Sequence, residues 1–329
     1  MDSFEKYLKK FKVFLPPLSG YTDVAFRMLL AEFGVPIFCT EMVNARAVVE
    51  GNKKTQTMLG RIEGFDGVQG VQLVGHDANV MGKAAEMVQD AGFDYLDINM
   101  GCTVRKVVKK GEGVALMKNP VLAANIVRRV VKNLDIPVSV KIRSGFDDVS
   151  LNAVELAISC VDAGAGLVCV HGRSGQHRFQ GECNHSIIAS VVESVNVPVV
   201  GNGGLRCGTD VVTLMESTGC DAVMPGRWLI GNPWCFEEIS SALDKKSYSP
   251  PNLDERKKWC KRHIELCVDF LGEKDAVIIM RRIFYKYFPD CMNSIYLKQK
   301  LHTSVSLCEL NGLLDAIDSV GQRLFFVKN

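Results

Sequence analysis

Cys102 lies in a segment whose residue types are suited to chemistry. The segment 97–106 starts as an apolar strand, continues through Asn99 and becomes a basic loop that closes at Gly111 and Gly113. Loops that follow buried strands carry functional groups more often than core residues do. A thiol placed there can meet a substrate, so Cys102 is a candidate nucleophile, redox thiol or metal ligand.

The remaining cysteines and histidines narrow these choices. The chain has 12 cysteines and 6 histidines, but no two cysteines have CxxC spacing and the histidines are scattered. Both observations argue against a redox pair and against a zinc site, so we expect no metal. Four cysteines lie in apolar runs and are expected to be small core residues: Cys39, Cys160, Cys169 and Cys220.

The composition is that of a folded protein of 329 residues, with 47% hydrophobic and 23% charged residues. Its net charge of +2 argues against a bulk polyanion binder. Basic residues nevertheless gather near the C-terminus, where residues 256–300 contain 11 Lys or Arg and 5 Asp or Glu. Residues 1–12 lack the apolar stretch of a signal peptide, and no apolar run is long enough to span a membrane. We therefore expect a cytoplasmic protein with no membrane partner.

Alternating strands and helices must position these groups. Short β-branched runs predict strands at 13–18, 36–42, 70–74, 95–99, 138–143, 167–171, 197–201 and 222–225. Patterns between them predict helices at 24–32, 78–91, 121–133, 151–163 and 187–194. Eight such units match an α/β fold of the (β/α)8 TIM barrel type. A doubly wound open sheet is the alternative, but the turn 16–20 lacks the glycine fingerprint of a dinucleotide site.

A second unit follows the barrel. Pro250 and Pro251 interrupt the chain, and the sequence after them contains helical patterns without strand signals. We therefore predict a catalytic barrel over 1–243, a linker over 244–252 and a small all-helical C-terminal domain over 253–329.

The active site of such a barrel lies at the C-terminal ends of its strands. Nearly every predicted strand ends in polar, cationic or glycine residues, which random surface loops would not supply so regularly. In chain order these residues are Pro17, Leu18, Glu41, Gln72, Asn99, Lys141, Arg143, His171, Arg173, Asn202, Gly203, Gly204, Gly226 and Arg227.

Three of these groups have more specific interpretations. The glycines after the last two strands, with Arg227, suit a phosphate site, although αβ turns alone would also explain them. Lys141 lies within a strand and needs an anionic partner, which the N1/C2=O edge of a reduced flavin would supply. Asp97 or Glu41 is the alternative partner for this ammonium group. His171, at a strand end, is interpreted as a ligand contact rather than a core histidine.

Several segments together resemble the tRNA-dihydrouridine synthases, flavin enzymes that reduce uridine in tRNA. The segments are 15–27, 71–75, 97–102, 106–113, 140–145, 170–173, 201–204 and 225–234, and 97–113 is the most diagnostic. Residues 276–287 resemble the helical tRNA-binding domain of the bacterial B-type subgroup. The resemblance implies an FMN-binding barrel and a tRNA-binding helical domain, with tRNA as the partner. It implies no obligate protein partner.

Residue roles follow from the resemblance by position. It implies that FMN is held by Pro17, Leu18, Ser19, Gln72, Lys141, Asn202, Gly203, Gly204, Gly226 and Arg227, with His171 against the flavin. NADPH or NADH would reduce the flavin, which passes hydride from N5 to C6 of uracil. Cys102 would be the proton donor, because hydride addition at C6 develops an enolate that an acid must protonate at C5. Residues facing the substrate or its backbone would be Asn99, Arg105, Lys106, Arg143, Arg173, Arg281, Arg282 and Lys286.

The charge of the cysteine loop bears on the acid role. We expect its four cations to lower the pKa of the thiol until RNA phosphates offset them. These cations are Arg105, Lys106, Lys109 and Lys110.

In the helical domain, the segment 281–288 interleaves basic and aromatic residues. Helical spacing puts Arg282 and Lys286 on one face, which suits the positioning of phosphates, although an ordinary amphipathic helix has the same pattern.

The chain departs from the family pattern at three places. Thr103 stands where the family usually has Pro, and Gly204 replaces a usual Asp. The segment Ser174-Gly-Gln-His177, with His185, replaces a more typical Thr…Gln…Trp pattern. Two other functions remain open. One is a flavin barrel oxidoreductase acting on a free dihydropyrimidine, which would not need the basic helical domain. The other is a catalytically inactive RNA-binding relative.

Overall fold

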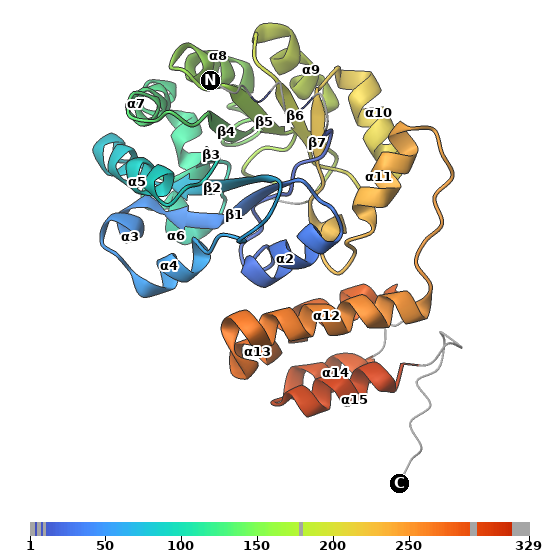
Figure 1. Cartoon of the computed structure of the whole chain (residues 1–329). Coiled ribbons are helices and arrows are strands. Elements are labelled where there is room, and N and C mark those ends of the chain that lie inside the picture. The colour runs from blue at the N-terminus through green and yellow to red at the C-terminus, as the bar shows by residue number, and fades with distance from the viewer. Residues whose placement is uncertain (1–3, 5–7, 9–10, 178–179, 290–294, 318–329) are drawn as a thin grey trace.

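The computed structural model describes Phe4, Leu8 and residues 11–177, 180–289 and 295–317. Seven parallel strands form one sheet in sequence order, each paired with the next along the chain (Figure 1). The strands are β1 Ile37–Asn44, β2 Val68–Val74, β3 Tyr95–Met100, β4 Val138–Arg143, β5 Leu167–His171, β6 Val199–Asn202 and β7 Ala222–Met224. The sequence prediction of an α/β barrel is confirmed.

The eighth predicted strand, 13–18, is reduced to an isolated bridge between Val13 and Val223. Phe14 N–H donates to the carbonyl oxygen of Val223 over 2.9 Å, and Leu15 N–H donates to that of Ile37 over 3.3 Å. This segment therefore closes the ring between β7 and β1. It ends there because Pro16 and Pro17 have no N–H group with which to continue the ladder.

Helices connect the strands and cover the outside of the barrel (Figure 1). Asp23 caps the first of them by accepting from Phe26 N–H over 2.9 Å, and Asn119 caps α7 in the same way. The five predicted helices are confirmed to within a few residues. The helices of the barrel are α2 Val24–Glu32, α3 Ala45–Val49, α4 Lys53–Met58, α5 Ala78–Asp90, α6 Arg105–Val108, η1 Gly113–Lys118, α7 Pro120–Val131, α8 Ala153–Asp162, α9 His185–Ser194, α10 Gly208–Thr218, η2 Arg227–Leu229 and α11 Cys235–Leu243.

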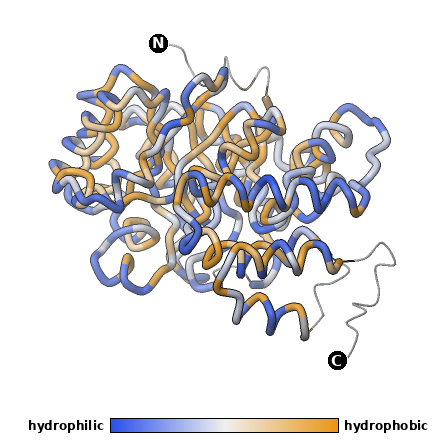
Figure 2. The backbone as a smooth tube through the Cα atoms, turned by 60° about the horizontal axis from the view of Figure 1, so that its bottom comes forward, coloured by the Kyte–Doolittle hydropathy of each residue, from blue (hydrophilic) through white to orange (hydrophobic). Residues whose placement is uncertain are grey.

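Two apolar layers hold the barrel together. The larger lies between the outer faces of the strands and the helices, and includes Leu96, Ile98 and Val140. The smaller fills the interior of the barrel below its mouth, where Phe4 and Tyr95 meet edge to face at 5.5 Å. Hydrophobic stretches accordingly run through the centre of the barrel in Figure 2.

The C-terminal helices are α12 Leu253–Leu271, α13 Glu273–Ile283, η3 Phe284–Tyr287, α14 Ile295–Thr303 and α15 Leu307–Asp315. Residues 244–252 connect them to α11 without a helix or strand. Asn252 and Glu255 form a reciprocal capping box at the start of α12. Within the described part of the chain, no helix is both long and apolar enough to cross a membrane.

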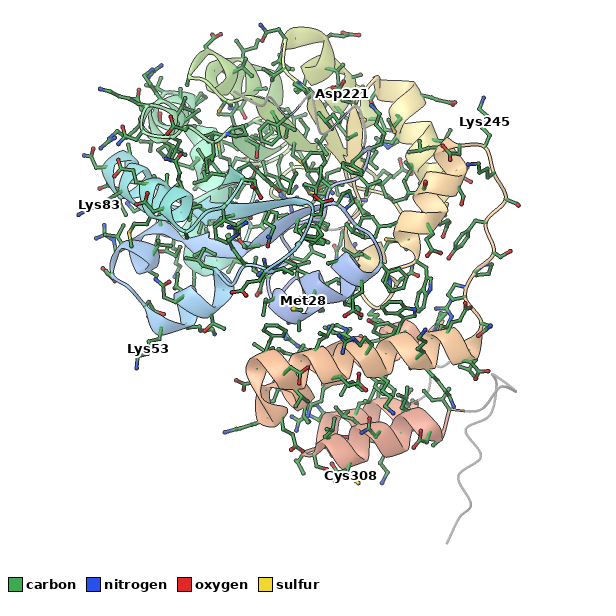
Figure 3. The ribbon with its side chains drawn as sticks, viewed as in Figure 1. Met28, Lys53, Lys83, Asp221, Lys245 and Cys308 are labelled. Atoms are coloured by element: carbon green, nitrogen blue, oxygen red, sulfur yellow. The ribbon has the colours of Figure 1, made fainter. Side chains whose placement is uncertain are left out.

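These helices pack on the barrel through α2. The rings of Phe33 and Trp259 lie 4.0 Å apart, those of Phe26 and His263 lie 5.1 Å apart, and Arg262 forms an ion pair with Glu32. Figure 3 shows Met28 on α2, where that helix faces α12. Because a shared apolar cluster spans both parts of the chain, their relative placement is fixed by burial rather than by the linker.

Candidate active site

Polar side chains replace apolar ones as each strand approaches the mouth of the barrel. Side chains at alternate positions of a strand share one face. On β3 the interior face therefore changes from Tyr95 to Asp97 and then Asn99, and on β5 from Cys169 to His171. The register pairs Arg143 with His171 and His171 with Asn202, so neighbouring strands bring these groups to one level.

Lys141 is held inside the mouth by an amide. Its ammonium group donates to Oδ1 of Asn202 over 2.8 Å, and Nδ2 of Asn202 donates to the carbonyl oxygen of Met224 over 2.6 Å. Within the described residues Lys141 makes no ion pair with Asp97 or Glu41, the alternative partners considered from the sequence. The ammonium group therefore keeps donor capacity for an anionic or carbonyl ligand.

A buried network beside Lys141 includes two residues that sequence reasoning did not place in the site, Asp97 and Ser139. Gln72 Nε2 donates to Oδ2 of Asp97 over 2.7 Å, and the Ser139 hydroxyl donates to Oδ1 over 2.6 Å. Asn99 Nδ2 donates to Oε1 of Gln72 over 2.7 Å. Burial raises the pKa of Asp97, and these hydrogen bonds oppose that shift. The network fixes which edge of each amide faces the mouth.

The cysteine loop is positioned by Asn99. Its Oδ1 accepts from the backbone N–H groups of Gly101 at 3.2 Å and Cys102 at 2.9 Å. The other side of the loop packs on Gly113, which has φ of +63°, and a Cβ there would lie 2.7 Å from the carbonyl oxygen of Cys102. Val114 N–H donates to that same oxygen over 3.0 Å. Glycine is therefore required at 113 for the loop to close on the thiol.

The prediction that the loop cations lower the pKa of the Cys102 thiol is wrong. Burial raises the pKa of Cys102 above its ordinary value, and Glu112 adds to the rise, whereas Arg143 opposes it. Arg105 and Lys106 are exposed, so water screens their charges. The shift therefore favours the protonated thiol, opposite to the predicted direction.

Arg143 supports the cysteine loop from inside the barrel. Its Nε donates to the carbonyl oxygen of Gly101 over 2.7 Å, and another guanidinium nitrogen donates to that of Ser174 over 3.0 Å. Burial lowers the pKa of Arg143 to about 10, although the Cys102 side chain opposes the shift. The side chain thus connects the loops after β3 and β5 instead of extending toward solvent.

His171 faces the same opening and is uncharged. Burial, followed by the positive charges of Lys141, Arg143 and others, lowers its pKa well below the ordinary range. A guanidinium nitrogen of Arg173 lies 3.4 Å from Nε2 of His171. Gly203 has φ of +112°, and a Cβ there would lie 2.6 Å from the His171 ring. The ring can occupy its place only because residue 203 has no side chain.

The two loops predicted to bind phosphate lie at adjacent strand ends. Gly203 and Gly204 follow β6, and Gly226 and Arg227 follow β7, while the contact from Asn202 to Met224 ties the two strands together. A Cβ added at Gly226 would meet no atom within 4 Å, so open space lies over this loop. The exposed Arg227 begins η2 beside it.

The loop over 17–19 lies beside the closing seam of the barrel. Leu18 N–H donates to Oγ1 of Thr22 over 2.9 Å, and Gly20 N–H donates to the carboxylate of Glu41. Pro17 and Leu18 are half-buried and Ser19 is exposed, so this loop is fixed at its base and open above.

The basic residues predicted to meet RNA separate into two groups. Arg105 and Lys106 are exposed on α6, next to Cys102. In the helical domain, Arg281 donates to the carbonyl oxygen of Ser304, and Lys286 lies 5.0 Å from the ring of Tyr285. Arg281 therefore holds the domain together, which its sequence position did not indicate.

A lysine, paired amides, a neutral imidazole and a loop cysteine at the carboxyl ends of parallel strands define an α/β-barrel enzyme. Within the described residues, no group of three or more His, Cys, Asp or Glu could hold a metal ion. The family described as Dihydrouridine synthase (Dus) matches residues 14–320. The chain belongs to the dihydrouridine synthase family.

Individual relatives agree with this assignment. The "tRNA-dihydrouridine synthase B" of Pasteurella multocida is 32% identical over 277 residues, which cover 84% of this chain and 83% of that protein. Its counterpart in Shewanella oneidensis is 33% identical, with 84% and 86% covered. A "Probable tRNA-dihydrouridine synthase" of Rhizobium leguminosarum is 35% identical, with 81% of each chain covered.

Proposed function

We propose that this protein reduces uridine in tRNA to 5,6-dihydrouridine, with bound FMN, with NADPH or NADH as reductant and with Cys102 as the acid. Family membership supports the reaction class. The observation that carries the residue assignment is the half-buried Cys102 thiol, whose pKa burial raises, on a loop fixed by Asn99 and Gly113 at the barrel mouth. We place the reaction in the cytoplasm, where tRNA substrates occur.

The donor set at the mouth fits FMN. The Lys141 ammonium and the Gln72 amide would bind the polar edge of the flavin ring, and the neutral His171 would lie against it. Gly203, Gly204, Gly226 and Arg227 would hold the phosphate, and the loop of Pro17, Leu18 and Ser19 would cover the ring system. Bound FMN would supply the hydride that reduces C6 of the uracil.

Cys102 supplies the proton in this proposal. The thiol donates it to C5 of the base and becomes a thiolate, which recovers a proton from solvent before the next turnover. Asn99 orients the loop through two backbone hydrogen bonds, and Arg143 holds it from below through the Gly101 carbonyl. Arg173, half-buried beside His171, would contact the substrate backbone.

The helical domain gives the proposal its RNA partner. Residues 256–300 carry six more Lys and Arg than Asp and Glu. These helices pack on α2 at the side of the barrel, so a bound RNA could contact both parts of the chain. A basic surface of this kind positions a folded RNA by its phosphates rather than by base sequence.

Mapping dihydrouridine in total RNA from cells with and without this gene tests the reaction. We expect one or more uridine positions in tRNA to lose the modification when the gene is absent. Purified protein should carry a flavin that NADPH or NADH bleaches. An unchanged map in every RNA would exclude the proposed reaction.

A further inference from the structure

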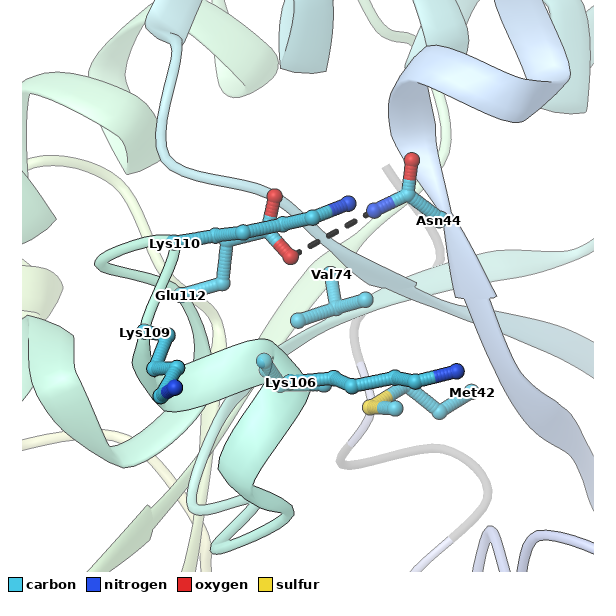
Figure 4. A pocket seen from close by; sticks show the side chains of 8 residues that line it. Met42, Asn44, Val74, Lys106, Lys109, Lys110 and Glu112 are labelled. Carbon is cyan, nitrogen blue, oxygen red and sulfur yellow. Dashed lines mark hydrogen bonds between the residues drawn. The ribbon is translucent and has the colours of Figure 1, made fainter.

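A pocket of about 440 Å³ lies directly behind the cysteine loop. Its walls come from the ends of β1 and β2 and from the basic segment that follows Cys102 (Figure 4). Two adjacent residues connect the pocket to the thiol. Gly113 packs on Cys102, and the residue before it, Glu112, lines the pocket. The pocket lies across the barrel from the glycine loop after β6, because β2 and β6 are four places apart in the closed ring.

The pocket has an apolar floor between two basic side chains. Figure 4 shows Lys106 beside Met42 on one side, Lys110 on the other, and Val74 between them. Val74 is buried, whereas Lys106 and Lys110 are exposed. The aliphatic stems of two lysines that border an apolar floor leave room for a planar ring, with the ammonium groups free for phosphates on either side.

Glu112 supplies a buried carboxylate at one end of this pocket. The residue is only 6% exposed. Its nearest polar partners are long contacts, 3.4 Å to Asn44 Nδ2 and 3.4 Å to His76 Nδ1. In the described part of the chain, none of the three pocket lysines (Lys106, Lys109, Lys110) makes an ion pair within 4 Å. The carboxylate therefore keeps acceptor capacity, and the lysine ammonium groups keep donor capacity for another anion.

We propose that this pocket receives a nucleotide next to the target uridine, with an amino-bearing base on Glu112 and its phosphates on Lys106 and Lys110. The proposal rests on the proposed function and adds to it a determinant of substrate choice. A carboxylate accepts hydrogen bonds from exocyclic amino groups and repels the carbonyl edge of uracil. The segment 104–112 directly follows Cys102 and lines the pocket, so a nucleotide next to a base presented to the thiol is within reach of it.

The position of the pocket favours RNA over the reductant. A nicotinamide must reach the flavin at the same face that receives uracil, whereas this pocket lies on the far side of the cysteine loop from the predicted flavin phosphate site. A ribonucleotide strand bound at the thiol needs cationic contacts beyond the target base, and Lys106 and Lys109 line this pocket.

A double-mutant cycle between protein and RNA tests the proposal. Full-length wild type and Glu112→Leu are assayed with a tRNA transcript that wild type modifies. In matched transcripts, an amino-bearing base immediately 5′ or 3′ of the mapped uridine is replaced by its analogue without the amino group. For wild type, kcat/KM should fall roughly 10-fold when the amino group is removed at one of these positions. For Glu112→Leu, removal of the same amino group should cause no further fall in kcat/KM. Glu112→Gln, which keeps one acceptor oxygen, should retain part of the discrimination and serves if the leucine variant folds poorly.

Lysine variants test the phosphate contacts. Lys106→Ala and Lys110→Ala should each raise KM for RNA roughly threefold or more and reduce its salt dependence. Lys83→Ala, an exposed lysine on the outer helix α5, is the matched control (Figure 3). Additive losses in the cycle at both neighbouring positions would overturn the proposal, as would a change in KM for NADPH but not for RNA. Dihydrouridine formation by wild type in these assays separates such a result from a failure of the proposed function.

Discussion

Arg282 of α13 donates to the carbonyl oxygen of Gly20 over 3.3 Å, and its guanidinium lies 5.7 Å from the ring of Tyr21. Gly20 directly follows the loop over 17–19 at the mouth of the barrel. The helical domain is therefore attached to the rim of the candidate active site by a cation that was predicted to bind RNA. Its neighbour Arg281 points back into the helical domain, toward Ser304.

This contrast predicts different effects for neighbouring arginines. Arg281→Ala should lower the free energy of unfolding by about 1–3 kcal/mol, because it leaves the Ser304 carbonyl without its charged partner. Arg282→Ala should lower it by no more than about 1 kcal/mol, because its contacts are exposed. RNA affinity should fall more in Arg282→Ala. Urea denaturation and filter binding at fixed salt measure the two effects, and a larger loss of affinity in Arg281→Ala would contradict the assignment.

Cys102→Ala should reduce the rate of dihydrouridine formation roughly 10²–10⁴-fold, because the acid for C5 is lost. Reduction of the flavin by NADPH should be unchanged, since it needs no proton from this thiol. Stopped-flow bleaching and a single-turnover assay on full-length tRNA separate the two steps. Cys308→Ala, at an exposed cysteine, is the control. An unchanged rate in Cys102→Ala would exclude the acid role.

The raised pKa of Cys102 also predicts a pH profile. The thiol stays protonated through neutral pH, so the rate of the chemical step should be flat there and decline only above the ordinary thiol range. A decline that begins below pH 7 would show that the loop cations control the thiol after all. Single-turnover rates across this range, with flavin reduced beforehand, measure the profile.

Lys141→Met should weaken FMN binding by roughly 10-fold or more, because hydrogen bonds from charged donors contribute about 1.5–3 kcal/mol. The bound flavin fraction after dialysis and a fluorescence titration of the apoprotein measure this loss. Lys132→Met, at an exposed lysine that ends α7, should retain flavin fully. Equal retention in both variants would remove Lys141 from the cofactor site.

Gly203→Ala should be more harmful than its backbone angle alone explains. A Cβ there meets the His171 ring at 2.6 Å in addition to the strain of φ +112°. Gly51→Ala, with φ +66° and nothing within 4 Å, isolates the cost of the angle. We expect about 1–2 kcal/mol of destabilisation at Gly51 and a larger loss, with displaced flavin, at Gly203. Equal unfolding energies and equal flavin content would show that the ring moves aside freely.

His263 predicts acid sensitivity of the contact between barrel and helices. Burial lowers its pKa to about 3, so below pH 6.5 the unfolded chain binds a proton that the folded protein excludes. Its contribution therefore lowers stability by about 1.4 kcal/mol per unit as the pH falls from 6.5 toward 3. Asp23, whose pKa burial raises to about 6, acts in the opposite direction between pH 6 and 3.8.

Comparison of variants isolates the histidine. As the pH falls from 7 to 5, His263→Phe should lose less unfolding free energy than wild type, whereas His302→Phe, at an exposed position, should behave like wild type. Urea titrations at several pH values measure the slopes. The same slope in His263→Phe and wild type would assign the acid sensitivity to other groups.

Patterns with strong local causes could be predicted from the sequence. The helix α2 was predicted at its observed bounds because Asp23 is a capping residue ahead of an apolar run. The strand 13–18 was overestimated because β-branched and aromatic residues precede two prolines whose missing N–H groups end the ladder. Short helices such as α3 and α6 contain too few residues for a period to be visible.

The residue types of the site could be predicted from the sequence, but the orientation of the Arg143 side chain and the direction of the Cys102 pKa shift could not. Side chains of Gln72, Lys141 and Asn202 meet at the mouth because strand ends converge there. Arg143 turns inward to Gly101, and burial of the thiol outweighs the nearby cations, because both depend on tertiary packing. The one available signal for Glu112 was an acidic residue between two glycines in a basic loop.

The closing seam between β7 and β1 has a consequence for how the barrel opens. Elsewhere two strands separate only if a ladder of several residue pairs is broken, whereas here Val13 forms one bridge to β7 and Leu15 donates one hydrogen bond to β1. Local opening follows the path of lowest free energy. The backbone amides of Phe14 and Val223 should therefore exchange with solvent deuterium before those of β3 and β4. The barrel should open first at the seam that carries the loop at 17–19.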